Sequence, residues 1–198
     1  MFATKENAEV ARRIARESVT LLENALAMPR DGTIVVVSNG SSAAVDEDNA
    51  FEHSPTNHRL NEQVRQRIPA AQTVVLSTAM KPDEMDRACA AAERAGVVVC
   101  GLFTRVRSYV EEAIKVPKPF VALIERLAAG GRKIALLNFG NPYVLADLPR
   151  TAFALCTFSD TADSIDAAVA TLFGELAPRG KLPVRISGHY PFGHGLTK

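Results

Sequence analysis

Two neighbouring carboxylates, Glu111 and Glu112, are the first candidates for chemistry in the sequence. Paired carboxyl groups can serve as general acid and base. Adjacent residues on a helix do not share a face, however, so both glutamates are weak catalytic candidates. Arg105, Arg107 and Tyr109 precede them. Arginine donates paired hydrogen bonds to hydroxyl and carboxylate groups and tyrosine offers a flat ring face, so this segment is either a substrate-facing loop or an ordinary solvated one.

The common motifs of cofactor and metal binding are absent. Asn39–Ser42 contains one glycine after the first apolar run, whereas a dinucleotide-binding turn needs three. There is no Walker A loop, GxSxG elbow or HExxH helix. His53 and His58 lie beside Glu52, which favours a solvated loop over a metal site. We therefore expect no cofactor and no metal.

The three cysteines, Cys89, Cys100 and Cys156, form no CxxC pair, so structural zinc is not expected. Cys100 and Cys156 end apolar runs. This placement predicts buried thiols in strands, where a free cysteine behaves as a small apolar side chain.

Composition is that of an ordinary globular protein. The 198 residues are 47% hydrophobic and carry 23 basic and 22 acidic side chains, a net charge of +1 that argues against a nucleic-acid partner. No apolar run approaches the roughly 18 to 20 residues that span a bilayer, so no membrane partner is expected. The first residues, MFATKENAEVARR, lack the apolar core of a signal peptide. We expect a cytoplasmic chain as it stands, with the location of an exported or retained parent protein left open.

Strand and helix patterns alternate along the chain. A helix is expected over Glu6–Glu23, with Thr4 as its cap, and Leu182–Ile186 is a candidate edge strand. The alternation predicts one mostly parallel sheet of five or six strands in a three-layer α/β/α sandwich, formed by residues 1–198 as a single domain. The other expected strands are Thr33–Ser38, Thr73–Ser77, Val97–Leu102, Lys133–Asn138 and Ala152–Phe158, and the other expected helices are Asn57–Arg67, Pro82–Ala95, Pro119–Ala129 and Thr161–Phe173.

Open sheets of this kind bind ligands at the carboxyl ends of their strands. Arg105, Arg107 and Tyr109 fall at such an end, directly after a central strand. Asp160 and Asp163 start the last helix, where we expect them to serve as cap and helix-dipole partners.

Three stretches resemble the C-terminal domain of family 3 glycoside hydrolases. Ala11–Asn24 (ARRIARESVTLLEN) looks like the helix that follows the family's inter-domain linker. Asn138–Pro149 (NFGNPYVLADLP) looks like the version in β-N-acetylglucosaminidase-like members. Leu172–Leu196 (LFGELAPRGKLPVRISGHYPFGHGL) resembles the closing signature of the family. The resemblance runs from about residue 6 to residue 196 and implies the same α/β/α sandwich.

The resemblance also implies where the catalytic groups lie. The family's nucleophile is an aspartate on a preceding (β/α)8 barrel, which alone takes about 250 residues and is absent from this chain. In β-glucosidase-like members the general acid is a glutamate on the loop after the third strand. In N-acetylglucosaminidase-like members a histidine–aspartate pair of the barrel replaces it. The corresponding loop here, Phe103–Tyr109, carries arginines in place of that glutamate, which favours the N-acetylglucosaminidase-like branch.

The function expected from the resemblance is that of an ancillary domain, which borders the sugar site of a missing barrel and is inactive alone. Its partners are then the barrel and a carbohydrate substrate, and the surface that the barrel would cover should favour self-association of the isolated chain. Two alternatives stay open. The chain is a self-sufficient glycosidase that uses Glu111 or Glu112, or it is a flavodoxin-like module that binds a small ligand at its strand ends.

Overall fold

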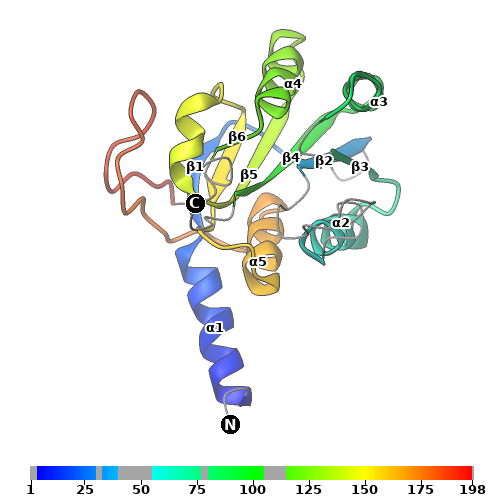
Figure 1. Cartoon of the computed structure of the whole chain (residues 1–198). Coiled ribbons are helices and arrows are strands. Elements are labelled where there is room, and N and C mark those ends of the chain that lie inside the picture. The colour runs from blue at the N-terminus through cyan, green and yellow to red at the C-terminus, as the bar shows by residue number, and fades with distance from the viewer. Residues whose placement is uncertain (1–3, 30–32, 40–54, 77–79, 105–114, 198) are drawn as a thin grey trace.

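A six-stranded sheet between helices organises the computed structural model, which describes residues 4–29, 33–39, 55–76, 80–104 and 115–197 (Figure 1). The strand order is β1-β6-β5-β4-β2-β3, and every neighbouring pair is parallel except β1 and β6. The predicted α/β/α sandwich with a mostly parallel sheet is therefore confirmed. The strands are β1 (Thr20–Asn24), β2 (Ile34–Asn39), β3 (Gln72–Leu76), β4 (Val97–Thr104), β5 (Ile134–Gly140) and β6 (Phe153–Cys156).

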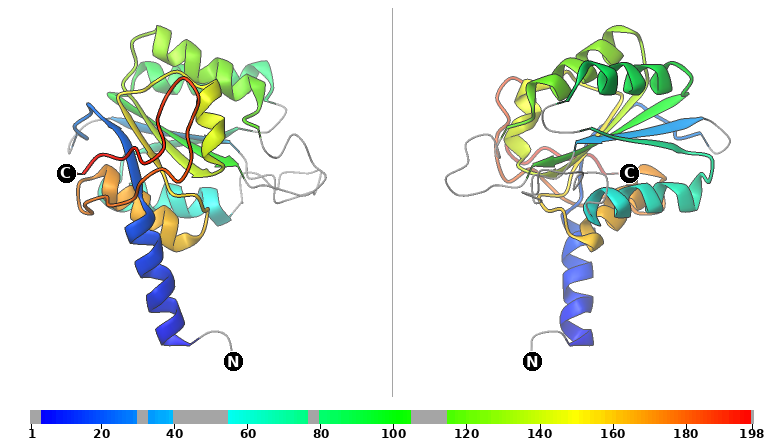
Figure 2. Two further views of the ribbon diagram at one scale, coloured as in Figure 1. Left: turned by 90° about the vertical axis from the view of Figure 1, so that its left-hand side faces the viewer. Right: turned by 45° about the vertical axis from the view of Figure 1, so that its right-hand side comes forward.

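Helices cover both faces of the sheet, α3 and α4 on one side and α2 and α5 on the other (Figure 2). Successive strand residues point to opposite faces, so β2 buries Val35 and Val37 against the first pair and Ile34 and Val36 against the second. This two-sided burial explains the uninterrupted apolar runs of the strands. The helices are α1 (Lys5–Ser18), α2 (Pro55–Arg67), α3 (Pro82–Glu93), α4 (Lys118–Ala129), α5 (Ala162–Leu172) and the short 3₁₀ helix η2 (Pro142–Asp147).

The N-terminal helix is shorter than predicted. Thr4 caps α1 as expected, since its side chain accepts a hydrogen bond from Asn7 N at 3.1 Å. The helix ends at Ser18, however, and the next residues form the antiparallel edge strand β1. Leu21 and Leu22 enter the two opposite cores, which only an extended backbone allows. The predicted helix over Glu6–Glu23 was therefore wrong beyond Ser18.

The predicted edge strand Leu182–Ile186 does not join the sheet. Leu182 instead exchanges backbone hydrogen bonds with the last part of the chain, donating to His194 O at 2.8 Å and accepting from Gly193 N at 2.9 Å. The residue that does reach the sheet is Leu196, whose N–H donates to Leu21 O of β1 at 2.8 Å. This closing segment, residues 180–196, therefore shields the outer edge of β1.

Side chains fasten the closing segment to β1. The hydroxyl of the buried Tyr190 donates to Glu23 Oε1 at 2.9 Å, and Arg150 Nε donates to the same oxygen at 2.7 Å. The His194 ring stacks on Tyr190 with centroids 5.0 Å apart, and Leu22 O accepts from His194 Nε2 at 3.0 Å. The tyrosine and histidine of the YPFGHGL ending thus have a structural role.

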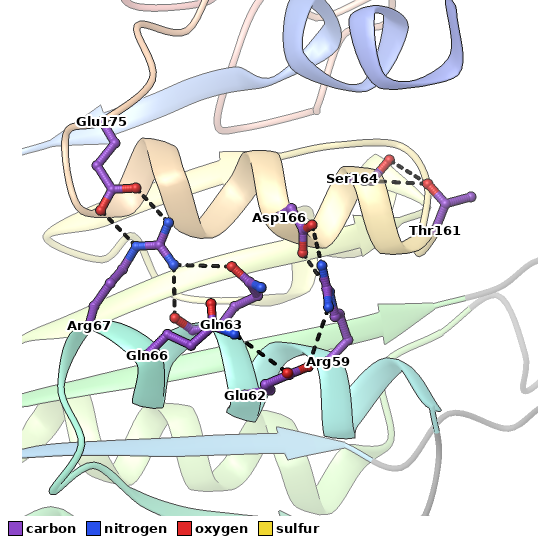
Figure 3. A network of polar contacts seen from close by, with 9 residues as sticks. All are labelled: Arg59, Glu62, Gln63, Gln66, Arg67, Thr161, Ser164, Asp166 and Glu175. Carbon is purple, nitrogen blue, oxygen red and sulfur yellow. Dashed lines mark hydrogen bonds and ion pairs between the residues drawn. The ribbon is translucent and has the colours of Figure 1, made fainter. Parts of the chain in front are cut away.

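Two bidentate ion pairs fasten α2 on the other face, one to α5 and one to the segment that follows α5 (Figure 3). Arg59 of α2 donates to both carboxylate oxygens of Asp166 on α5, at 2.7 and 2.5 Å. Arg67, at the end of α2, binds Glu175 in the same way, and this contact lowers the pKa of Glu175 below its ordinary value. All four side chains are partly exposed, so the pairs orient the helices more than they stabilise the fold.

Gly180 lies where the closing segment crosses the junction of α1 and β1. A Cβ there would lie 2.3 Å from Ser18 O and 2.7 Å from Val19 O, both backbone atoms that cannot turn away. We expect Gly180→Ala to lower the free energy of unfolding by about 1 to 3 kcal/mol in urea titration. Gly96→Ala is the matched control, because its nearest neighbour would be Thr33 O at 3.6 Å. Equal stability of the two variants would contradict this close approach.

Candidate functional site

The strand order reverses between β2 and β4, because the chain first moves from β2 to β3 and then continues on the other side of β2 through β4, β5 and β6. In open α/β sheets, ligands bind at the carboxyl ends of the strands at such a switch point. Residues 40–54 follow β2 and residues 105–114 follow β4, and both segments lie outside the described residues. The same holds for all five predicted site residues: Arg105, Arg107, Tyr109, Glu111 and Glu112. What the structure describes is the edge from which the two segments start.

Asn39 closes the switch point on one side. Its buried side chain donates from Nδ2 to Phe103 O at 3.0 Å and accepts from Phe103 N at Oδ1 at 2.7 Å. The backbone ladder between β2 and β4 runs as far as the pair Ser38 and Gly101. Beyond that pair the asparagine amide, which carries a donor and an acceptor like a peptide group, takes the place of a further ladder residue.

Gly140 and Asn141 hold the other side of β4. Asn141 N donates to both the carbonyl oxygen and the hydroxyl of Thr104, at 3.2 and 3.1 Å. Gly140 has a φ of 132° and would place a Cβ only 2.3 Å from Thr104 O, so this close approach requires glycine. The last residue of β4 is thereby bound to the turn after β5.

The side chain of Asn138 in β5 holds the turn that follows this strand. Its buried Nδ2 donates to Asn141 O at 3.0 Å and to Cys156 Sγ at 3.3 Å, and Asn141 in turn caps η2 by accepting from Tyr143 N at 3.1 Å. Phe139 stacks on Phe103 with ring centroids 4.8 Å apart. Both asparagines of the NFGNPY stretch therefore have a defined role in shaping the carboxyl edge.

The described carboxyl ends of β2, β4 and β5 offer hydrogen bonds and shape but no acid or base, since Asn39, Thr104, Asn138, Gly140 and Asn141 are all neutral. The nearby thiols are not nucleophiles, because burial raises the pKa of Cys100 to about 12 and that of Cys156 to about 11. Cys100 and Cys156 are buried and free in strands, as predicted, and Cys89 is buried and free in α3.

At the start of α5, the cap is Thr161, which accepts from Ser164 N at 3.4 Å. Asp163 lies in the first turn, where its charge complements the helix dipole as predicted. Within the described part of the chain, no group of three His, Cys, Asp or Glu side chains could hold a metal ion. Nor is any described helix long and apolar enough to cross a bilayer.

Comparison with known proteins identifies this domain. The sequence model of the glycosyl hydrolase family 3 C-terminal domain matches residues 19–196. The chain belongs to this family. Among curated protein sequences, none matches the chain. The family 3 C-terminal domain match begins at the residue that follows α1, so α1 precedes the matched region.

Solved family 3 enzymes share the fold. A β-N-acetylglucosaminidase from Paenibacillus sp. str. FPU-7 is 20% identical with a TM-score of 0.69, over 94% of this chain and 34% of that one. A β-glucosidase from Listeria innocua is 17% identical with a TM-score of 0.70, over 98% and 34%. The β-glucoside phosphorylase BglX is 16% identical with a TM-score of 0.64, over 93% and 32%. This family 3 chain thus spans about a third of the length of each enzyme.

The two hydrogen bonds between the Asn39 side chain and the Phe103 backbone predict how substitutions of Asn39 affect stability. Asn39→Ala leaves the buried N–H and C=O of Phe103 unpaired, so we expect a loss of about 1 to 3 kcal/mol for each group. Asn39→Asp keeps the shape, but only its protonated form can donate to Phe103 O, and burial raises its pKa. The stability of this variant should therefore be highest at about pH 4 and fall as pH rises through the raised pKa.

Urea titration from about pH 4 to about pH 8 measures both effects, with the wild-type chain at each pH as the reference. The deficit of Asn39→Ala should be constant over this range, because alanine does not titrate. A deficit of Asn39→Asp that is equally constant would show that the carboxyl does not face Phe103 O.

Proposed function

We propose that this chain is the ancillary sandwich domain of a β-N-acetylglucosaminidase-like family 3 glycoside hydrolase and is inactive without its barrel. The observation that carries the proposal is the combination of a family match over residues 19–196 with a length of only about a third of the solved family enzymes. The part of those enzymes that this chain lacks has to supply the remaining machinery.

The chemistry of the edge supports an ancillary role. A retaining glycosidase needs two carboxyl groups about 5 to 5.5 Å apart across the scissile bond. The described carboxyl ends of β2, β4 and β5 carry amides, a hydroxyl and glycine instead. In this proposal the barrel contributes the nucleophile, and the sandwich borders the sugar with the segments that leave β2 and β4.

Two features support the N-acetylglucosaminidase-like branch. Arg105 and Arg107 occupy the loop in which glucosidase-like members carry their acid. The NFGNPY stretch resembles that branch, and the structure assigns its asparagines to shaping the carboxyl edge. The barrel would then also supply the general acid. Arg105, Arg107 and Tyr109 would serve as hydrogen-bond donors and a stacking face toward the N-acetylated sugar.

The isolated chain should not hydrolyse chromogenic β-N-acetylglucosaminides or β-glucosides, since no covalent glycosyl intermediate can form without the nucleophile. Steady-state release of the chromophore measures this. The double variant Glu111→Gln, Glu112→Gln sets the background. Turnover by the wild-type chain above that background would favour a self-sufficient glycosidase and contradict the ancillary role.

In the full-length enzyme, single substitutions Arg105→Ala and Arg107→Ala should each reduce kcat/KM by the equivalent of about 1 to 3 kcal/mol if the arginine donates to substrate. Lys118→Ala is a matched control, because it removes a cation at the start of α4. Kinetics that are unchanged in both arginine variants would make this segment an ordinary solvated loop.

A further inference from the structure

Helix α1 presents its apolar side to solvent. Val10 and Ile14 are 40% and 61% exposed, and Ala11 beside them is exposed as well. We call these three residues the outer stripe. Of the whole helix, only Ala15 is buried. An amphipathic helix of a globular domain normally turns such a stripe toward its own core, so the orientation of α1 indicates a second binding surface.

The charged side of α1 faces its own domain. With 3.6 residues per turn, Arg12 and Arg16 lie opposite Ile14. Both line a cleft of about 430 Å³ that α2 and α5 complete, with Arg67, Asp163 and Asp166 among the other lining residues. Within the described residues, neither Arg12 nor Arg16 forms an ion pair. Helix α1 contacts α5 on the side that carries Arg12 and Arg16. The outer stripe lies away from this contact, so its own domain does not cover it.

The base of α1 is anchored while its first turns project away from the domain (Figures 1 and 2). Gly180 N donates to Val19 O at 2.9 Å, and Thr20 Oγ1 donates to Ser18 O at 3.1 Å. Helices of fewer than about 12 to 15 residues are marginal in water, and α1 has 14. A projecting helix of this length needs contacts along its side, and the outer stripe is the apolar surface that it offers.

We propose that α1 is a docking helix whose outer stripe packs into an apolar groove on the catalytic barrel of the same polypeptide. This inference rests on the proposed function, because it takes the barrel as the occupant. The match to the family domain begins at residue 19, so α1 lies between that domain and whatever precedes it. The aligned enzymes are about three times as long as this chain, which provides the partner.

The size of the stripe favours a tethered partner over a second copy of the chain. Stable association of separate proteins buries about 800 Å² on each partner, contributed by some 20 to 30 residues. Three small apolar side chains are far below that. A tether raises the effective concentration of the partner to the millimolar range, at which a weak patch is occupied.

The position of α1 places the barrel where the proposed function needs it. Thr20, the first residue of β1, pairs with Cys156, and Cys156 pairs with Asn138 near the carboxyl end of β5. Helix α1 therefore leaves the sheet at its carboxyl edge, and Ile14 is about 6 Å along the helix from Ser18. A partner that covers the outer stripe thus also borders the candidate functional site.

Hydrogen exchange of the α1 amides in the isolated chain and in the full-length enzyme tests the proposal. We expect exchange at residues 5–18 to be at least about tenfold slower in the full-length enzyme, because docking adds to the opening free energy. The double variant Val10→Ala, Ile14→Ala should lose this protection. Alanine favours the helix itself, so the loss reports the side chains. Phe192→Ala, at a 72% exposed residue of the closing segment, is the control that should keep the protection.

Equal exchange rates in the two proteins, or a double variant that behaves like wild type, would overturn the docking role. Protection of α1 in the isolated chain that grows with concentration would also overturn it, because the occupant would then be a second copy. Turnover of a β-N-acetylglucosaminide by the full-length enzyme tests the proposed function separately. An active enzyme whose α1 amides are not protected from exchange would contradict the docking role alone. An inactive enzyme would contradict the proposed function.

Discussion

Buried backbone groups must be hydrogen-bonded, and this constraint is most severe where β2 and β4 part. The backbone ladder between β2 and β4 ends at the pair Ser38 and Gly101, so Phe103, which pairs with Phe139 of β5, has no ladder partner on the β2 side. The side chain of Asn39 supplies both missing bonds, and Asn141 meets the corresponding need of Thr104 on the other side. The end of β4 is therefore held between its two neighbours by groups that carry no charge.

The same requirement acts at the outer edge of the sheet. An exposed strand would leave a row of unpaired backbone groups on β1. The closing segment provides Leu196 as a backbone partner, and Tyr190 and Arg150 meet at Glu23 to hold it. The glycines of this segment matter because backbone passes over backbone, with Gly180 above the α1–β1 junction. In this chain the residues of the closing signature therefore cover the edge of the sheet.

Local patterns predicted most of the sheet, because five strands are apolar on both faces and this pattern does not depend on distant residues. The stretch TLLEN predicts a helix, because its leucines also fit a helical period. Its strand conformation depends on pairing with β6, which lies about 130 residues later, and no local pattern contains that information. The role of Asn39 is also invisible to local patterns, since it needs the register of β2 against β4. Asparagine at the end of an apolar run was the available signal.

The proposed ancillary role accounts both for the neutral ends of β2, β4 and β5 and for the outward apolar side of α1. In that proposed role the domain needs a rigid edge and a fixed orientation, not reactive groups of its own. Rigidity comes from the hydrogen bonds that Asn39 and Asn141 form on the two sides of β4. Orientation comes from the continuity of α1 with β1 through the buried Val19, since β1 is hydrogen-bonded across the sheet to β6 and from there to β5 and β4. A barrel docked on α1, as proposed, would therefore be placed relative to the end of β4 by a continuous ladder of hydrogen bonds, without any loop between them.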